Sequence, residues 1–236
     1  MISETDLLKK IQNNKAVTSS FSGHQFVLDA AGCLYWPKHD LLVFSDLHFE
    51  KGSFLSQFAN PLPRYDTAKT LAKMSLAIDE YSPQKVLCLG DSLHDSNAVK
   101  RMLEDDRDAI NSLVSQVPEW FWVLGNHDPE IPKEIHGTTL PHIKLDKLLW
   151  VHEPEDLTLH IDVNAQVIGH FHPKIMVKRS GQRMTGKCFL IANNTFLMPA
   201  LGQYTGGLSV NHEAITSLYQ GQAEHAILFN NKVFLV

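Results

Sequence analysis

Cysteine is scarce in this sequence, which contains only three among its 236 residues. Cys33, Cys88 and Cys188 are odd in number, far apart and include no Cys-x-x-Cys pair, so we expect neither a disulfide framework nor a cysteine zinc site. Long hydrophobic runs are also lacking, since runs such as Leu41–Phe44 are much shorter than the ~20 residues of a membrane span. Residues 1–10 lack the apolar stretch of a signal peptide. These absences predict reduced thiols, no membrane association and a cytoplasmic protein.

Neither sign of charge is in large excess. Lys and Arg number 21 and Asp and Glu number 26, which gives a formal net charge of -5. That balance argues against a protein that coats nucleic acid, although it leaves room for a local basic patch. Hydrophobic residues make up 44% and charged residues 20%, a composition that predicts a folded globular core. The abundant residue is histidine, of which there are 13.

Short apolar runs alternate with amphipathic stretches over most of the chain, which predicts an α/β layered domain. No internal repeat or linker interrupts the pattern, so we expect a single domain over residues 1–236. Near-continuous hydrophobic runs predict four buried strands, at Leu41–Phe44, Lys85–Leu89, Phe121–Leu124 and Leu148–Val151.

Two helices are expected between the first three strands, giving a β-α-β-α-β order. The first covers residues 67–81, with Ala68, Leu71, Ser75 and Ile78 on one face, and the second covers residues 98–117. A proline follows each of them closely and ends it.

The pattern changes after Gln166 to short runs broken by Gly, Asn and Pro, which predicts antiparallel strands and hairpins. The expected strands are Lys174–Val177, Phe189–Ala192, Thr195–Met198, Ile215–Tyr219, Ala226–Phe229 and Val233–Val236. Asn230 and Asn231 are expected to form a tight turn between the last two.

Polar residues gather directly after the buried strands, where open α/β sheets bind their ligands. The clusters are Ser45-Asp46-Leu47-His48, Gly90-Asp91-Ser92-Leu93-His94, Gly125-Asn126-His127-Asp128, His152-Glu153 and, after a later run at Val167–Ile168, Gly169-His170-Phe171-His172. Each cluster taken alone is an ordinary turn. Imidazole and carboxylate together, without thiolate, are the ligands of metals such as Mn, Fe, Zn or Co. Five clusters at strand ends therefore predict a dinuclear metal site with a shared carboxylate.

In this order the motifs Asp-x-His, Gly-Asp-x-x-His, Gly-Asn-His-Asp, a lone His and Gly-His-x-His resemble those of the calcineurin-like metallophosphoesterases. The resemblance implies a four-layer α/β sandwich, with two mixed β-sheets flanked by helices. It also implies which residues hold two divalent metal ions: Asp46, His48, Asp91 and His172 for one, and Asp91, Asn126, His152 and His170 for the other. Manganese is the expected metal, with Fe, Zn, Co or Ni as alternatives.

The catalytic residues follow from the same resemblance. His127 is expected beside the substrate, outside both coordination spheres, as the proton donor, and His94 as its orienter or a second acid. His94 stands where the serine/threonine protein phosphatases carry Asp followed by Arg-Gly. This difference favours nucleic-acid diesters over phosphoproteins as substrates.

Further segments resemble one bacterial branch of the family, the ligase-associated DNA damage response endonucleases (PdeM). They are SDLHFEKGS at 45–53, CLGDSLHD at 88–95, GHFHPK at 169–174 and PALGQYTGGL at 199–208. The branch implies a metal-dependent nuclease or phosphodiesterase with a DNA substrate, single-stranded DNA being one candidate, that works beside a DNA ligase and a helicase in repair.

Basic residues are concentrated just after Gly169-His170-Phe171-His172. Lys174, Lys178 and Arg179 are candidate contacts to a nucleic-acid backbone, and a solvated hairpin is the simpler alternative. Two other functions remain open at this stage: a phosphodiesterase for small nucleotides, and a non-catalytic interaction module with the same fold. The sequence does not indicate an oligomeric state.

Overall fold

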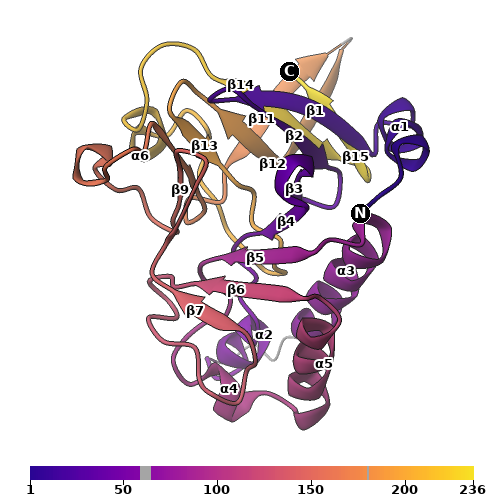
Figure 1. Cartoon of the computed structure of the whole chain (residues 1–236), viewed down its shortest axis with the longest axis vertical. Coiled ribbons are helices and arrows are strands. Elements are labelled where there is room, and N and C mark those ends of the chain that lie inside the picture. Colours follow the sequence, from indigo (N-terminus) through magenta and orange to yellow (C-terminus); the bar gives the residue numbers. More distant parts are fainter. Residues whose placement is uncertain (59–64, 180) are drawn as a thin grey trace.

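The computed structural model describes residues 1–58, 65–179 and 181–236 (Figure 1). Its helices are α1 (Glu4–Gln12), α2 (Lys51–Leu55), α3 (Asp66–Tyr81), α4 (Ala98–Arg101), α5 (Glu104–Ser115) and α6 (Glu213–Thr216). Two short 3-10 helices lie at Pro37–His39 and Leu157–Leu159. Within the described ranges, no helix combines the length and apolar character needed to cross a membrane.

The first sheet has seven strands in sequence order. They are β1 (Ala16–Phe21), β2 (His24–Asp29), β3 (Leu34–Trp36), β4 (Leu41–Phe44), β5 (Lys85–Leu89), β6 (Glu119–Val123) and β7 (Thr138–Leu140). The pairs from β1 to β4 are antiparallel, and those from β4 to β7 are parallel. The parallel part explains why the loops after β4, β5 and β6 meet at one edge.

The second sheet has eight strands and is also mixed. They are β8 (Ile143–Leu145), β9 (Leu148–Trp150), β10 (Ala165–Ile168), β11 (Lys174–Arg179), β12 (Gln182–Ile191), β13 (Thr195–Leu197), β14 (Glu224–Phe229) and β15 (Lys232–Leu235). Strand β10 is parallel to both of its neighbours, β9 and β13, whereas β11 and β12 form an antiparallel hairpin.

Three hydrophobic clusters bind the layers together. The first lies between the first sheet and helices α3 and α5, which run side by side along one face of that sheet in Figure 1. The second lies between the two sheets, and the third covers the outer face of the second sheet with α6. In β4, Leu42 and Phe44 enter the first cluster while Leu41 and Val43 enter the second. A strand buried on both faces therefore reads as a continuous apolar run.

The sequence predicted α3 correctly in extent, but its buried face differs from the expected one. Leu71 and Ile78 are buried as expected, whereas Ala68 is exposed and Ser75 is only partly buried. The buried face also includes Met74 and Ala77, which belong to the same hydrophobic cluster as side chains of the first sheet.

The single helix expected over residues 98–117 is wrong, because the chain breaks there into α4 and α5. Met102 and Leu103 have extended backbones, with ψ of 138° and 147°. Glu104, Asp105 and Asp106 then occupy the first turn of α5, where negative charge favours a helix start.

The strand expected over Ile215–Tyr219 is also wrong. That segment begins in α6, where the His212 side chain caps the helix by accepting a hydrogen bond from the Ala214 N–H at 3.2 Å. The tight turn at Asn230 and Asn231 is confirmed, with φ of 50° and 53° between β14 and β15.

Candidate metal centre

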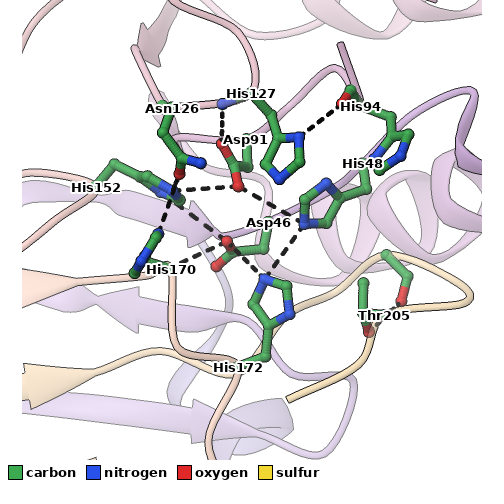
Figure 2. A network of polar contacts seen from close by, with 12 residues as sticks. Asp46, His48, Asp91, His94, Asn126, His127, His152, His170, His172 and Thr205 are labelled. Atoms are coloured by element: carbon green, nitrogen blue, oxygen red, sulfur yellow. Dashed lines mark hydrogen bonds and ion pairs between the residues drawn. The ribbon is translucent and has the colours of Figure 1, made fainter. Parts of the chain in front are cut away.

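The clusters predicted to bind metal follow strands of both sheets and converge on one focus (Figure 2). Asp46 and His48 follow β4, Asp91 follows β5 and Asn126 follows β6 of the first sheet. His152 follows β9, while His170 and His172 follow β10 of the second. The first two loops also run along each other, with Asp46 N–H donating to the Gly90 carbonyl at 3.2 Å and His48 N–H to the Asp91 carbonyl at 2.9 Å.

Four of these side chains form a compact group. One ligand atom from each of Asp46, His48, Asp91 and His172 lies within 4.8 Å of the other three. The His172 Nε2 atom is 2.9 Å from Asp46 Oδ1 and 3.3 Å from His48 Nε2. The side chain of Asp46 is fully buried, and that of His172 is 12% exposed. This group corresponds to the first of the two predicted ligand sets.

The second predicted set surrounds Asp91 from the other side. The His152 Nε2 atom is 3.3 Å from Asp91 Oδ2 and 3.1 Å from Asn126 Oδ1. Asn126 Oδ1 is also 3.0 Å from His170 Nδ1. Because Asp91 Oδ2 is 3.8 Å from His48 Nε2 as well, this carboxylate lies between the two sets. Such a position suits a bridging ligand.

The backbone at the site is held in an unusual conformation. Five of the seven predicted ligand residues have positive φ, between 46° and 64°: Asp46, His48, Asp91, His170 and His172. Left-handed backbone is uncommon outside glycine, and when several such residues occur together at one place they mark a site where function constrains the chain.

Three glycines let the loops approach closely enough to bring these side chains together. A Cβ on Gly90 would lie 2.2 Å from His152 Nδ1, and one on Gly125 would lie 2.3 Å from Asp91 Oδ1. A Cβ on Gly169 would lie 2.3 Å from Ser45 Oγ and 2.6 Å from Asp46 Oδ2. Any side chain at these three positions would therefore displace a predicted ligand or its neighbour.

Asp128 fixes the relative position of the loops after β5 and β6. Its carboxylate is buried and accepts three backbone hydrogen bonds, from Ser92 at 2.7 Å, Leu93 at 3.0 Å and Gly125 at 2.9 Å. Burial, together with the charge of Asp91, raises the pKa of Asp128 to about 7 against the effect of these donors. The sequence showed Asp128 within Gly-Asn-His-Asp, but its positioning role emerges only from these contacts.

His127 lies at the solvent side of the site and is anchored at two points. Its Nδ1 atom is 2.8 Å from the His94 carbonyl oxygen, and its backbone N–H donates to Asp91 Oδ1 at 3.0 Å. The His94 ring stacks on the His127 ring at 5.1 Å between centroids. With Nδ1–H donating to the carbonyl, His127 presents Nε2 to the site. The contact that orients His127 is thus the backbone carbonyl of His94.

The protonation states of Asp46, Asp91 and His48 favour metal ligation, whereas His152 carries a proton that a metal ion would displace. Burial lowers the pKa of His48 to about 3, so this imidazole stays neutral as a ligand must. Burial opposes charge at Asp46 and Asp91 too, yet neighbouring histidines hold the pKa of both carboxyls below the ordinary value. Burial also disfavours charge at His152, but its hydrogen bond to Asp91 raises the pKa to about 9. Asp46 and Asp91 thus remain ionised and His48 remains neutral at pH 7.

The residues present fit two divalent ions. His48 Nε2 faces His172 Nε2, and His152 Nε2 faces two oxygens. Each of these nitrogen and oxygen atoms can offer a lone pair, so a proton or a cation has to lie between them. The His152 Nδ1 atom lies 3.1 Å from the Leu89 carbonyl, which directs its other ring nitrogen to the site. Nitrogen and carboxylate oxygen without sulfur match Mn, Fe, Co, Ni or Zn.

The predicted basic residues do not behave alike. Lys174 is half-buried at the start of β11, opposite Lys187 of β12. Lys178 is exposed and lies opposite Arg183. The side chain of Arg179 lies outside what the structure describes. Sequence reasoning missed Lys51, which begins α2 and feels the charges of Asp91 and Asp46, because nothing in its local pattern distinguishes it from a surface lysine.

Comparison with known proteins agrees with this geometry. The calcineurin-like phosphoesterase family matches residues 39–159, more than half of the chain. A search of curated protein sequences found no match. The solved structure of the Pseudomonas putida nuclease MPE is similar in fold, with a TM-score of 0.72 and 21% identity over 94% of this chain and 100% of that one.

Two solved structures are more distant. The Escherichia coli phosphoesterase Yfce has a TM-score of 0.40 and 17% identity over 83% of this chain and 97% of its own. The protein AQ665 of Aquifex aeolicus has a TM-score of 0.40 and 17% identity over 60% of this chain and 81% of its own. On the family match, the chain belongs to the calcineurin-like phosphoesterases and is a metal-dependent phosphoesterase.

Proposed function

We propose that this protein is a dinuclear metal phosphodiesterase that cleaves phosphodiester bonds in DNA. The observation that carries the proposal is the convergence of seven side chains from five strand ends on one focus, with His127 anchored beside it (Figure 2). The fold similarity to the Pseudomonas putida nuclease supports nucleic acid as the substrate.

Each predicted residue has a specific role in this proposal. Asp46, His48, Asp91 and His172 hold one ion, and Asp91, Asn126, His152 and His170 hold the other. Two bound divalent ions supply a nucleophile from water at neutral pH and neutralise charge on the phosphoryl oxygens. The chain itself adds position and one proton, since His127 is exposed at the mouth of the site and its Nε2 atom is directed there.

His94 contributes in a different way. Burial, and the positive charge of Lys51 next, lower the pKa of His94 to about 4, so its imidazole is neutral near pH 7. A neutral, stacked His94 fits a residue that holds His127 in place more closely than a second acid.

Replacing His127 by Asn tests the assignment of the proton donor. We expect the variant to retain its metal and to lose about 100-fold or more in kcat, a typical size for one general acid. Metal content is measured by mass spectrometry, and turnover on a generic aryl phosphodiester with Mn²⁺. His142→Asn is the matched control, because His142 lies outside the site beside Glu155. Loss of the metal from His127→Asn would make His127 a ligand and contradict the proposal.

The substrate is tested by comparing several phosphodiesters with the same Mn²⁺-loaded protein. Single-stranded DNA, duplex DNA, RNA and cyclic nucleotides are the informative set. Cleavage of DNA is expected, and hydrolysis of cyclic nucleotides alone would favour the small-nucleotide alternative. Manganese as the natural ion, a cytoplasmic location and association with a DNA ligase and a helicase in repair are parts of the same proposal, drawn from the resemblance to the repair branch.

A further inference from the structure

A groove lies beside the segment that contains Ala200 and Leu201. Two cavities of about 340 and 240 Å³ share the lining residues Ala30, Ala31, Lys73 and Asn231, so they adjoin each other, and we call them together the groove. The smaller cavity also reaches Lys187, Ala200 and Leu201. The Leu201 N–H donates to the Ser45 carbonyl at 2.9 Å and the Gly202 N–H to the Asp46 carbonyl at 3.0 Å, so this end of the groove adjoins the metal centre.

Four lysines from four elements lie at this groove or beside the metal centre. They are Lys51 of α2, Lys73 of α3, Lys174 of β11 and Lys187 of β12, and all four are half-buried. Burial, and then the positive charges of Lys73, Lys174 and Lys51, lower the pKa of Lys187 to about 8 against the opposing charge of Asp46. The positive charges are therefore close enough to repel one another.

None of these lysines forms an ion pair within the described residues, although the charges of Asp46 and Asp91 act on Lys51 and that of Asp46 on Lys187. In the parts of the chain that the structure describes, the lysines engaged in ion pairs are Lys9, Lys10, Lys38 and Lys85. The Lys187 ammonium group instead donates to the Ala200 carbonyl at 2.6 Å and the Gly202 carbonyl at 3.1 Å. Lys73 lines both cavities, and burial alone lowers its pKa.

Pairing in the β11–β12 hairpin adds to this repulsion. Lys174 lies directly opposite Lys187 in the antiparallel register, and Lys178 lies opposite Arg183. Residues opposite each other share a face, and opposed like charges destabilise a sheet. Four half-buried cations therefore lie close together in a chain whose net charge is -5, which favours an anionic ligand.

We propose that Lys51, Lys73, Lys174 and Lys187 form a phosphate track that holds the backbone of a nucleic-acid strand on one side of the scissile bond. Lys73 and Lys187 line the smaller cavity, and Lys174 lies opposite Lys187. Lys51 acts on Lys187 and interacts with Asp46, so the group reaches from the groove to the metal centre. A group of that extent suits a chain of phosphates better than a single anion. This inference rests on the proposed function and names the form of its substrate: a polynucleotide that extends beyond the cleaved bond.

The test measures binding separately from hydrolysis. Full-length, Mn²⁺-loaded protein is titrated into a fluorescent oligodeoxythymidylate with phosphorothioate linkages, which resist cleavage, at several salt concentrations. For Lys73→Gln we expect weaker binding and a salt slope smaller by about 0.7, the value for one phosphate contact on a single strand. Lys73→Arg should keep the slope. Lys85→Gln should match the unmodified protein, because Lys85 begins β5 and so lies at the opposite edge of the sheet.

Three results would overturn the track. The first is a salt slope of Lys73→Gln equal to that of Lys85→Gln, and the second is failure of the unmodified protein to bind the oligonucleotide. The third is a thymidine monophosphate affinity that depends on Lys73 as strongly as the oligonucleotide affinity does. Hydrolysis of an aryl phosphodiester tests the proposed function independently. Hydrolysis without a Lys73 effect on binding rejects only the track, whereas Lys73-dependent binding without any hydrolysis rejects only the activity.

Discussion

At the scale of single residues, the metal centre depends on backbone conformations and close contacts that ordinary side chains do not tolerate. Asp46, His48 and Asp91 are among the residues held at positive φ, a conformation that costs of the order of 1–3 kcal/mol per residue. Gly90 combines positive φ, at 73°, with direct contact against His152. The strands on either side hold the loops in place against this strain.

Gly90→Ala is expected to destabilise the protein and weaken its metal binding. Positive φ costs an alanine about 1–2 kcal/mol, and displacement of the His152 ring adds to that cost. Gly23→Ala is the matched control, because Gly23 has φ of 82° but open space around its Cα. Urea denaturation and Mn²⁺ titration calorimetry measure the two effects. Equal losses in both variants would mean that the contact with His152 is unimportant.

The residues of the site differ in how far the sequence could predict them. Asp91 and His170 lie in motifs directly after apolar runs, so their position at a strand end was readable. Lys51 and Lys73 have no such local signature, since what distinguishes them is their burial, which depends on elements distant in sequence.

At the scale of elements, the loops after β5 and β6 act as one unit because Asp128 accepts hydrogen bonds from both. Its three backbone donors, on Ser92, Leu93 and Gly125, lie in the loops that carry Asp91 and Asn126. Without that carboxylate, the two loops would lose their common anchor at a buried position.

Asp128→Ala is expected to lower the free energy of unfolding by about 3 kcal/mol or more, because three backbone N–H groups lose their acceptor. Asp128→Asn should lose clearly less, since its amide oxygen can still accept from Ser92 and Leu93. Urea denaturation compares the two. If alanine and asparagine cost the same, the hydrogen bonds are not the source of the stability.

Elements buried on both faces were the easiest to predict. β4 and β5 have the predicted bounds. A short, nearly continuous apolar run is typical of a strand that is buried on both faces. The break between α4 and α5 depends on two residues that turn extended within an otherwise helical pattern. β1 to β3 were not predicted. The mixed polar and apolar residues of β1 and β2 give no clear periodicity, and β3 is only three residues long.

At the scale of the whole molecule, the predicted ligands come from both sheets. All seven contact a partner from another loop, and His152 Nδ1 reaches the Leu89 carbonyl of the first sheet at 3.1 Å. Bound ions are therefore expected to fasten one sheet to the other.

Removal of metal with EDTA should lower the melting temperature by about 10–20 °C for two ions, each present at about a hundred times its dissociation constant, and Mn²⁺ should restore it. In Asp91→Asn the melting temperature should no longer respond to Mn²⁺, because the shared carboxylate is lost. Asp146→Asn, which removes a surface carboxylate paired with Lys38, is the control and should respond normally. A normal response of Asp91→Asn would show that the two ions do not share it.

The division of the ligands between the sheets also sets an order for biosynthesis. Five of the predicted ligands, from Asp46 to His152, leave the ribosome before β10, which His170 and His172 follow. Strand β10 pairs on one side with β13, which is made later still. A nascent chain therefore exposes five candidate ligands while two are missing. The set of ligands is complete only after β10 and β13 have been made and paired, so a chain that stops before β13 is expected to lack an intact metal centre.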